Sequence, residues 1–156
     1  MMPSGAPPID YEDLEFETLE EHWNEYELTN QIKAKGKFVA LRILRDKRNP
    51  DPNAIGMSGQ NLFVVNAPVE QRGPPSPLTP EEVQRTDYPR VSVLSNNEKW
   101  NKYQIVKSGV VLKVKLILNE VYRVQGRYDT DGMPCYLFNS TQMILPDKHA
   151  NTNIRS

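Results

Sequence analysis

The segment with the most recognisable chemistry is residues 128–132, Tyr-Asp-Thr-Asp-Gly, which looks like the start of a calcium-binding loop. Such loops place carboxylates at alternate positions before a glycine and are closed by a bidentate glutamate. Here the third acid is missing, and Ser140 stands where the glutamate should be. We therefore predict a hairpin turn that uses its Asp-Gly pair, and no metal site.

Imidazole and thiol groups are scarce, because the chain of 156 residues has only His22, His149 and Cys135. No Cys-His or Ser-His-Asp grouping, glycine-rich loop before a helix or metal-ligand spacing can be identified. The apolar neighbours of Cys135 predict a buried strand residue, since free cysteines are commonly buried. We expect no enzyme activity and no cofactor.

Lysines recur at alternate positions on two long apolar segments, 32–45 and 110–124, which puts them on one face of each strand. With two arginines further along, they could track the phosphates of a single-stranded nucleic acid. The favoured interpretation is a solvated face that also discourages edge pairing. The acidic run 12–27 would repel a polyanion on the same side. The nucleic-acid candidates are Lys33, Lys35, Lys113, Lys115, Arg123 and Arg127.

Both tryptophans lie in copies of one pattern, Glu-x-Trp-Asn-x-Tyr-x-(Leu/Ile), which starts at Glu21 and again at Glu98. Four identities at a separation of 77 residues predict an internal duplication. Along a strand the Trp would face one side, and the Asn and Tyr the other. The favoured interpretation is that the rings are core residues. In the alternative, they contact a partner or the other repeat. The candidate interaction residues are Trp23, Tyr26, Trp100 and Tyr103.

The repeats are expected to be built from strands. Glutamates alternate with Leu14, Phe16 and Thr18, which predicts a strand, with a helix over 10–22 as the alternative. Both long segments change the parity of their apolar residues, near 38–39 and 118–121, which predicts a bulge in each. The best sequence alignment shifts the long segments by 80 residues, matching Lys33 with Lys113, and the final strands by 73.

The predicted fold is mostly β. It comprises two tandem repeats of a four- or five-stranded antiparallel unit, an SH3-like or OB-like barrel or sheet, related by a pseudo-two-fold axis. The proposed segments are a flexible tail (1–8), repeat A (9–70), a proline-rich linker (71–87), repeat B (88–147) and a second tail (148–156). Within the linker, the sequence from Thr79 predicts a short helix, about Pro80 to Arg85. The long linker favours two separate units, and one interleaved barrel is the alternative.

Composition narrows the function further. A formal charge of −1 argues against coating nucleic acid through bulk charge, and no apolar run is long enough to span a membrane. A single cysteine favours a reducing compartment, so we expect a cytoplasmic protein. The expected function is a non-enzymatic protein-interaction module, a subunit or assembly factor of a larger complex, with a protein partner or self-association. The alternative is an RNA-binding barrel that uses the lysines.

Overall fold

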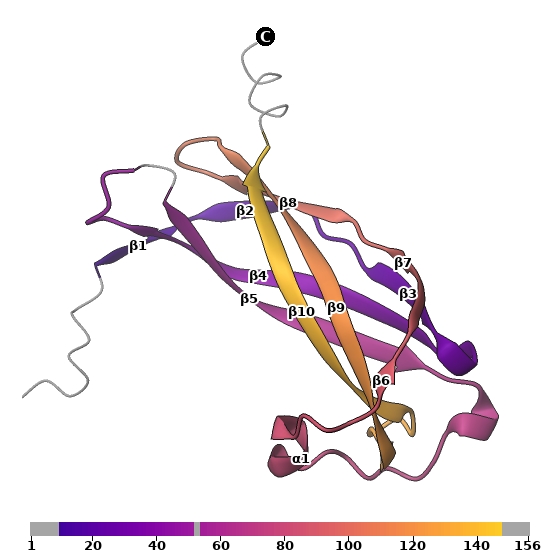
Figure 1. Ribbon diagram of the computed structural model, residues 1–156. Coiled ribbons are helices and arrows are strands. Elements are labelled where there is room, and N and C mark those ends of the chain that lie inside the picture. Colours follow the sequence, from indigo (N-terminus) through magenta and orange to yellow (C-terminus); the bar gives the residue numbers. More distant parts are fainter. Residues whose placement is uncertain (1–9, 52–53, 148–156) are drawn as a thin grey trace, which may run out of the picture.

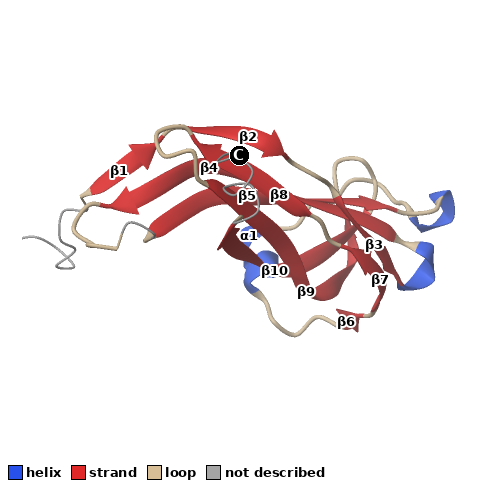
Figure 2. Cartoon of the chain, turned by 90° about the horizontal axis from the view of Figure 1, so that it is seen from above, coloured by secondary structure: helices blue, strands red, loops and turns tan. Residues whose placement is uncertain are grey.

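The computed structural model describes residues 10–51 and 54–147, and consists mainly of two antiparallel five-stranded sheets (Figures 1 and 2). The predicted tails, 1–8 and 148–156, lie outside the described residues. The strands are β1 (Tyr11–Leu14), β2 (Phe16–Glu20), β3 (Asn24–Leu28), β4 (Lys33–Asp46), β5 (Ile55–Asn66), β6 (Arg90–Val91), β7 (Val93–Asn97), β8 (Trp100–Ile105), β9 (Val111–Tyr128) and β10 (Pro134–Pro146).

The two sheets have matching plans. In sheet A, β3 and β1 pair with the first and last parts of β4, β5 pairs with the other edge of β4, and β7 pairs with β3. In sheet B, β8 and β6 pair in the same way with β9, β10 pairs with its other edge, and β2 pairs with β8. Each sheet therefore contains one strand from the other half of the chain.

The exchange happens at a single residue in each half. Leu14 pairs with Ile43 in sheet A, and Phe16 pairs with Ile105 in sheet B, so the chain crosses between sheets at Glu15. The second half crosses at the residue between β6 and β7 in the same manner. The favoured expectation of two separate units does not hold at the level of the sheets, because one extended segment borders both of them.

Both long strands contain the predicted bulge. In sheet A, Ala40 pairs with Gly59 and Arg42 with Ser58, so Leu41 is the extra residue. In sheet B the register shifts in the same way at Asn119 of β9. A bulge bends a strand and increases its twist. The long hairpins β4–β5 and β9–β10 consequently cross at an angle (Figure 1).

The bent strands supply two hydrophobic clusters. Tyr26, in the first cluster, packs with β4 through Ala34 and with the far half of β9 through Val121. The second cluster reverses this arrangement, with Ile43 from the far half of β4 and Val114 from the near half of β9. Each cluster thus needs both halves of the chain, which compensates for the small surface that a unit of about 60 residues can bury alone.

The linker contains the predicted helix, α1 (Pro80–Gln84), and two short 3-10 turns are η2 (Thr29–Gln31) and η3 (Val69–Gln71). Thr79 and Glu82 form a reciprocal capping box at the start of α1. The Glu82 carboxylate also binds Arg127 of β9 at 2.9 Å. The bond from the Thr79 backbone, followed by the Arg127 guanidinium, lowers the pKa of Glu82.

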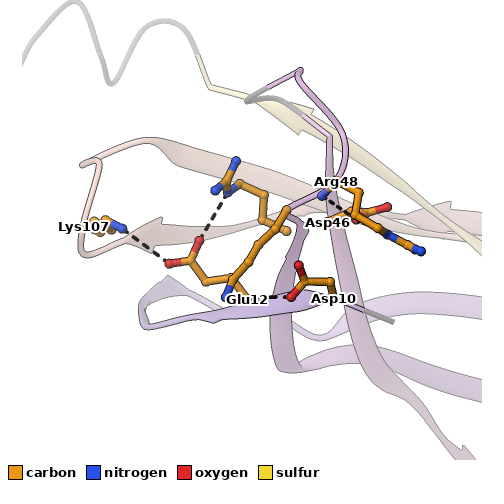
Figure 3. A network of polar contacts seen from close by, with 7 residues as sticks. Asp10, Glu12, Asp46, Arg48 and Lys107 are labelled. Atoms are coloured by element: carbon orange, nitrogen blue, oxygen red, sulfur yellow. Dashed lines mark hydrogen bonds and ion pairs between the residues drawn. The ribbon is translucent and has the colours of Figure 1, made fainter. Parts of the chain in front are cut away.

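A polar network ties β1 to the other sheet (Figure 3). Glu12 accepts a bond from Arg45 of β4 at 3.3 Å and pairs with Lys107, in the β8–β9 turn, at 3.4 Å. These cations, Lys107 first, lower the pKa of Glu12. Such solvent-exposed pairs stabilise a protein only slightly, so this network orients β1 more than it strengthens the fold.

Candidate functional site

The repeated Trp-Asn-x-Tyr pattern has the predicted orientation. Asn24, Tyr26 and Leu28 are buried, whereas Trp23 is 37% exposed on the opposite side. The second copy buries its asparagine, tyrosine and isoleucine in the same alternating way. The shared part of the pattern is therefore mainly a core element, as the favoured interpretation predicts.

The first asparagine forms a buried polar bridge between the halves. Asn24 Nδ2 donates to the Leu116 carbonyl at 2.9 Å and to the Tyr26 hydroxyl at 3.1 Å, and its Oδ1 accepts from the Lys99 amide at 2.9 Å. Tyr26 in turn donates to Glu98 Oε2 at 2.9 Å. Every partner except Tyr26 lies in the second half of the chain.

The second asparagine makes the mirror-image bridge. Asn101 Nδ2 donates to the Phe38 carbonyl at 3.0 Å and to the Tyr103 hydroxyl at 3.3 Å, and its Oδ1 accepts from the His22 amide at 2.9 Å. Tyr103 donates to Glu21 Oε2 at 2.9 Å. The repeated glutamate, asparagine and tyrosine thus form two crossed clasps that join the halves.

The clasps predict loss of stability at alkaline pH. Burial, together with the partner carboxylates Glu98 and Glu21, raises the pKa values of Tyr26 and Tyr103 well above their usual range. Stability from the neutral rings is complete below about pH 10 and declines above it, by roughly 1.4 kcal/mol per pH unit for each ring until the folded-state pKa is passed. Urea titrations between pH 8 and 11 should show this slope.

The double variant Tyr26→Phe/Tyr103→Phe should lose most of that slope, although its stability at neutral pH is lower. Tyr11→Phe alters a ring that is 49% exposed and serves as the control, with the slope unchanged. An equal slope in the double variant and the native chain would contradict the assignment of the effect to these two rings.

The buried tyrosines cannot contact a partner, with exposed fractions of 2% for Tyr26 and 0% for Tyr103. The tryptophans remain candidates. Lys37 lies 5.5 Å from the centre of the Trp23 ring. Trp100 is half-buried beneath two ammonium groups, those of Lys113 at 4.6 Å and Lys115 at 4.7 Å. Such cation–π contacts hold the lysines over the ring.

The sheet A lysines face glutamates. In the register of β3 and β4, Lys33 lies opposite Glu27, and Lys35 lies opposite Glu25. Opposite charges in cross-strand positions attract each other and reduce the local potential. The first predicted lysine stripe is therefore balanced by carboxylates on the neighbouring strand.

The sheet B lysines have different neighbours. Lys113 lies opposite Lys102, and Lys115 lies opposite Trp100. Lys102 pairs with Glu20 at 3.7 Å and with Asp147 at 3.4 Å. Within the part of the chain that the structure describes, no carboxylate lies within ion-pair distance of Lys113 or Lys115. The second stripe consequently keeps two cations that are not neutralised.

These registers correct the sequence alignment. Lys35, not Lys33, occupies the position that matches Lys113, which is a shift of 78 residues (113 less 35) in place of 80. Asn66 lies opposite the start of β4, whereas Asn139 lies beyond the bulge of β9, so the shift of 73 is also wrong. The alignment matched residue types, whereas hairpin pairing depends on turn length.

The two predicted arginines belong to another region. Arg123 donates to the Tyr136 hydroxyl at 2.9 Å, and Arg127 binds Glu82 at 2.9 Å. Lys115 and Arg123 are eight residues apart on β9, roughly 26 Å along an extended strand. Both guanidinium groups already have protein partners, so the six predicted basic residues do not form one continuous stripe.

Two sheet edges are the surface that sequence reasoning did not specify. Within the described residues, β5 pairs only with β4, and β10 pairs only with β9. Neither β5, of 12 residues, nor β10, of 13, contains a charged side chain. The available signal was the absence of any Asp, Glu, Lys or Arg at residues 52–69 and 132–146.

The free edges meet at one point and diverge from it (Figure 1). At the meeting point, Asn61 donates to Ser140 at 3.1 Å and accepts from Gln142 at 2.9 Å. Beyond it, apolar side chains are exposed on both strands: Leu62 by 42%, Val64 by 48%, Met143 by 43%, Ile144 by 38% and Leu145 by 41%.

The Asp-Gly segment forms the predicted turn between β9 and β10. Asp129 Oδ1 accepts from the amides of Asp131 and Met133, at 2.8 and 2.9 Å, and Gly132 has φ 81°. Cys135 is buried on β10, as predicted, and burial raises its thiol pKa. Among residues 10–51 and 54–147, no three His, Cys, Asp or Glu side chains could hold a metal ion.

No helix in the described ranges is long and apolar enough to cross a membrane. Comparisons with protein-family models, with curated proteins and with solved structures find no match for this chain, so its function is argued from its own residues and geometry.

Proposed function

We propose that this protein is a non-enzymatic interaction module, a subunit or assembly factor of a larger complex, which binds protein partners by adding a strand to its free edges. The observation that carries the proposal is the pair of long, uncharged, singly paired strands β5 and β10. A free edge presents a row of backbone N–H and C=O groups that another extended segment can pair with.

Unused edges are normally protected. Natural sheets protect them with lysines, inward-pointing charges, prolines or very short strands. The chain has 25% charged residues, so the absence of charge from two edge strands is a marked departure. Prolines occur only at the two ends of β10, at Pro134 and Pro146. These edges therefore have the character of pairing sites.

A photo-crosslinking residue placed at an edge tests the proposal. A probe at Val64 of β5 or Met143 of β10 should form a discrete adduct with a partner from the native host, and a probe at Val83 of α1, which is 52% exposed, should not. Adding the edge guard Leu145→Lys should lower the yield from the Met143 probe. Equal adducts at Val83, or none at either edge, would contradict strand addition.

We also infer an internal duplication of a small barrel-like unit. Its support is the correspondence of pairings: Leu14 with Ile43 and Val91 with Val121, at shifts of 77 (91 less 14) and 78 (121 less 43). The bulge residues Leu41 and Asn119 also differ by 78. The exchanged strands and crossed clasps fit the pseudo-two-fold relation that such a duplication implies.

A second candidate function is the binding of single-stranded nucleic acid at Trp100. The observation that favours it is the pair of cations, Lys113 and Lys115, on the face of an aromatic ring. The Glu20 carboxylate beside Lys102 opposes it. Nucleic-acid binding would fall steeply with salt, so an oligonucleotide is one of the probes in the experiment below.

A further inference from the structure

The outer face of sheet B next to the free edge combines apolar and basic side chains in rows. The first row crosses from Trp100 on β8 to Lys115 on β9 and Met143 on β10. The second row runs from Lys102 through Lys113 to Leu145. Each unneutralised lysine therefore lies one strand in from the edge, behind an exposed apolar residue.

Sheet A has no equivalent of this arrangement. There the rows run from Glu25 through Lys35 to Val64, and from Glu27 through Lys33 to Asn66. Each of these lysines has a glutamate directly opposite it on the inner strand. Although both edges can accept a strand, only the β10 edge lies beside cations that lack a carboxylate.

We propose that the free edge of β10 binds an extended acidic segment of a partner protein, one that carries carboxylates at alternate positions. This inference rests on the proposed function and specifies its partner. An added strand would lie about 5 Å from β10 and roughly 10 Å from β9. A lysine and a glutamate side chain together span that distance across Met143 or Leu145, because lysine stems pack on apolar surface while the ammonium group extends beyond it.

The spacing fixes the pattern of the partner. Lys113 and Lys115 are two residues apart, roughly 7 Å along β9, and point to the same face. Side chains two residues apart on an added strand have the same spacing and the same orientation. The recognised element is thus Glu-x-Glu or Asp-x-Asp in an extended segment, with backbone pairing providing affinity and the carboxylates providing selectivity.

A second copy of the chain fits this edge less well. Pairing two β10 edges would bring no carboxylate to either lysine pair, since β10 has no charged residue. A nucleic acid would supply anions but could not complete the backbone ladder. The acidic strand is the occupant that satisfies both the edge and the cations.

The test uses the full chain and a fluorescein-labelled peptide in which glutamate alternates with threonine, followed by fluorescence anisotropy. Lys113→Gln/Lys115→Gln should weaken binding about tenfold or more, equivalent to about 1.4 kcal/mol. The matched variant Lys33→Gln/Lys35→Gln, on sheet A, should change it by less than about twofold, because those lysines already face glutamates. N-methylation of alternate peptide amides keeps the charge but removes ladder donors, and should also abolish binding.

Other outcomes separate the failures. Equal affinity for a glutamine-threonine peptide would overturn the acidic preference and leave edge pairing intact. Binding that survives N-methylation, or tighter binding of an oligothymidylate with the same lysine dependence, would overturn strand addition in favour of a polyanion site. Concentration-dependent self-association that displaces the peptide would assign the edge to a second copy. If neither peptide binds and no edge crosslink forms, the proposed function fails as well.

Discussion

Replacing Asn24 by alanine is expected to lower the free energy of unfolding by about 2–4 kcal/mol, because several buried polar groups lose their partner at once. Asn24 is 2% exposed and bonds the Leu116 carbonyl and the Lys99 amide, both of the other half of the chain. Alanine cannot replace these bonds, and no water can take their place without opening the contact between the halves.

Asn101→Ala should cost a similar amount, since Asn101 is 3% exposed and makes the equivalent bonds to Phe38 and His22. Asn66→Ala changes an exposed asparagine on β5 and is the control, expected within about 0.5 kcal/mol of the native chain. Urea unfolding of the three variants provides the comparison. A cost below about 0.5 kcal/mol at Asn24 would show that the clasp does not hold the halves together.

Sequence reasoning could identify the elements because local chemistry determines them. Alternation around Leu14 and Phe16 predicts the first extended segment, and parity changes predict the bulges. The capping pattern at Thr79 predicts α1. In each case the informative residues are neighbours along the chain, so the pattern and the structure record the same constraint.

Strand exchange could not be predicted in this way. It depends on Glu15 and on Ser92, two polar residues where the chain passes from one sheet to the other, and neither has a distinctive pattern. The repeated Glu-x-Trp-Asn-x-Tyr motif contained the relevant information in its glutamate and asparagine. Their partners lie on long strands whose register depends on turn length, and sequence alignment misplaced that register.

The candidate site was predicted in part for the same reason. Alternation correctly groups Lys113 with Lys115, yet whether a lysine is neutralised depends on the adjacent strand. Glu25 and Lys102 hold matching positions opposite Lys35 and Lys113. That single difference in charge changes a balanced face into a basic one, and it becomes visible only when strands are paired.

Gly59→Ala is expected to destabilise the protein by about 2–3 kcal/mol or more, through overpacking at the bulge of β4. A Cβ atom at Gly59 would lie 2.4 Å from the Val39 carbonyl oxygen and 2.5 Å from the Phe38 ring. The oxygen belongs to the backbone of the paired strand, and Phe38 is 3% exposed, so neither group can move away without disturbing the sheet or the core.

Gly56→Ala is the matched control on the same strand, because its Cβ would meet nothing within 4 Å. It should be neutral or stabilising by up to about 1 kcal/mol, since alanine restricts the unfolded chain more than glycine does. Urea unfolding of both variants therefore measures the bulge rather than the general effect of a methyl group. Equal stabilities would show that β4 can straighten at Leu41. Because that bend carries Ala34 and Ile43 into different clusters, a straightened β4 would also leave one cluster without its cross-half contacts, and the crossed architecture would lose its physical basis.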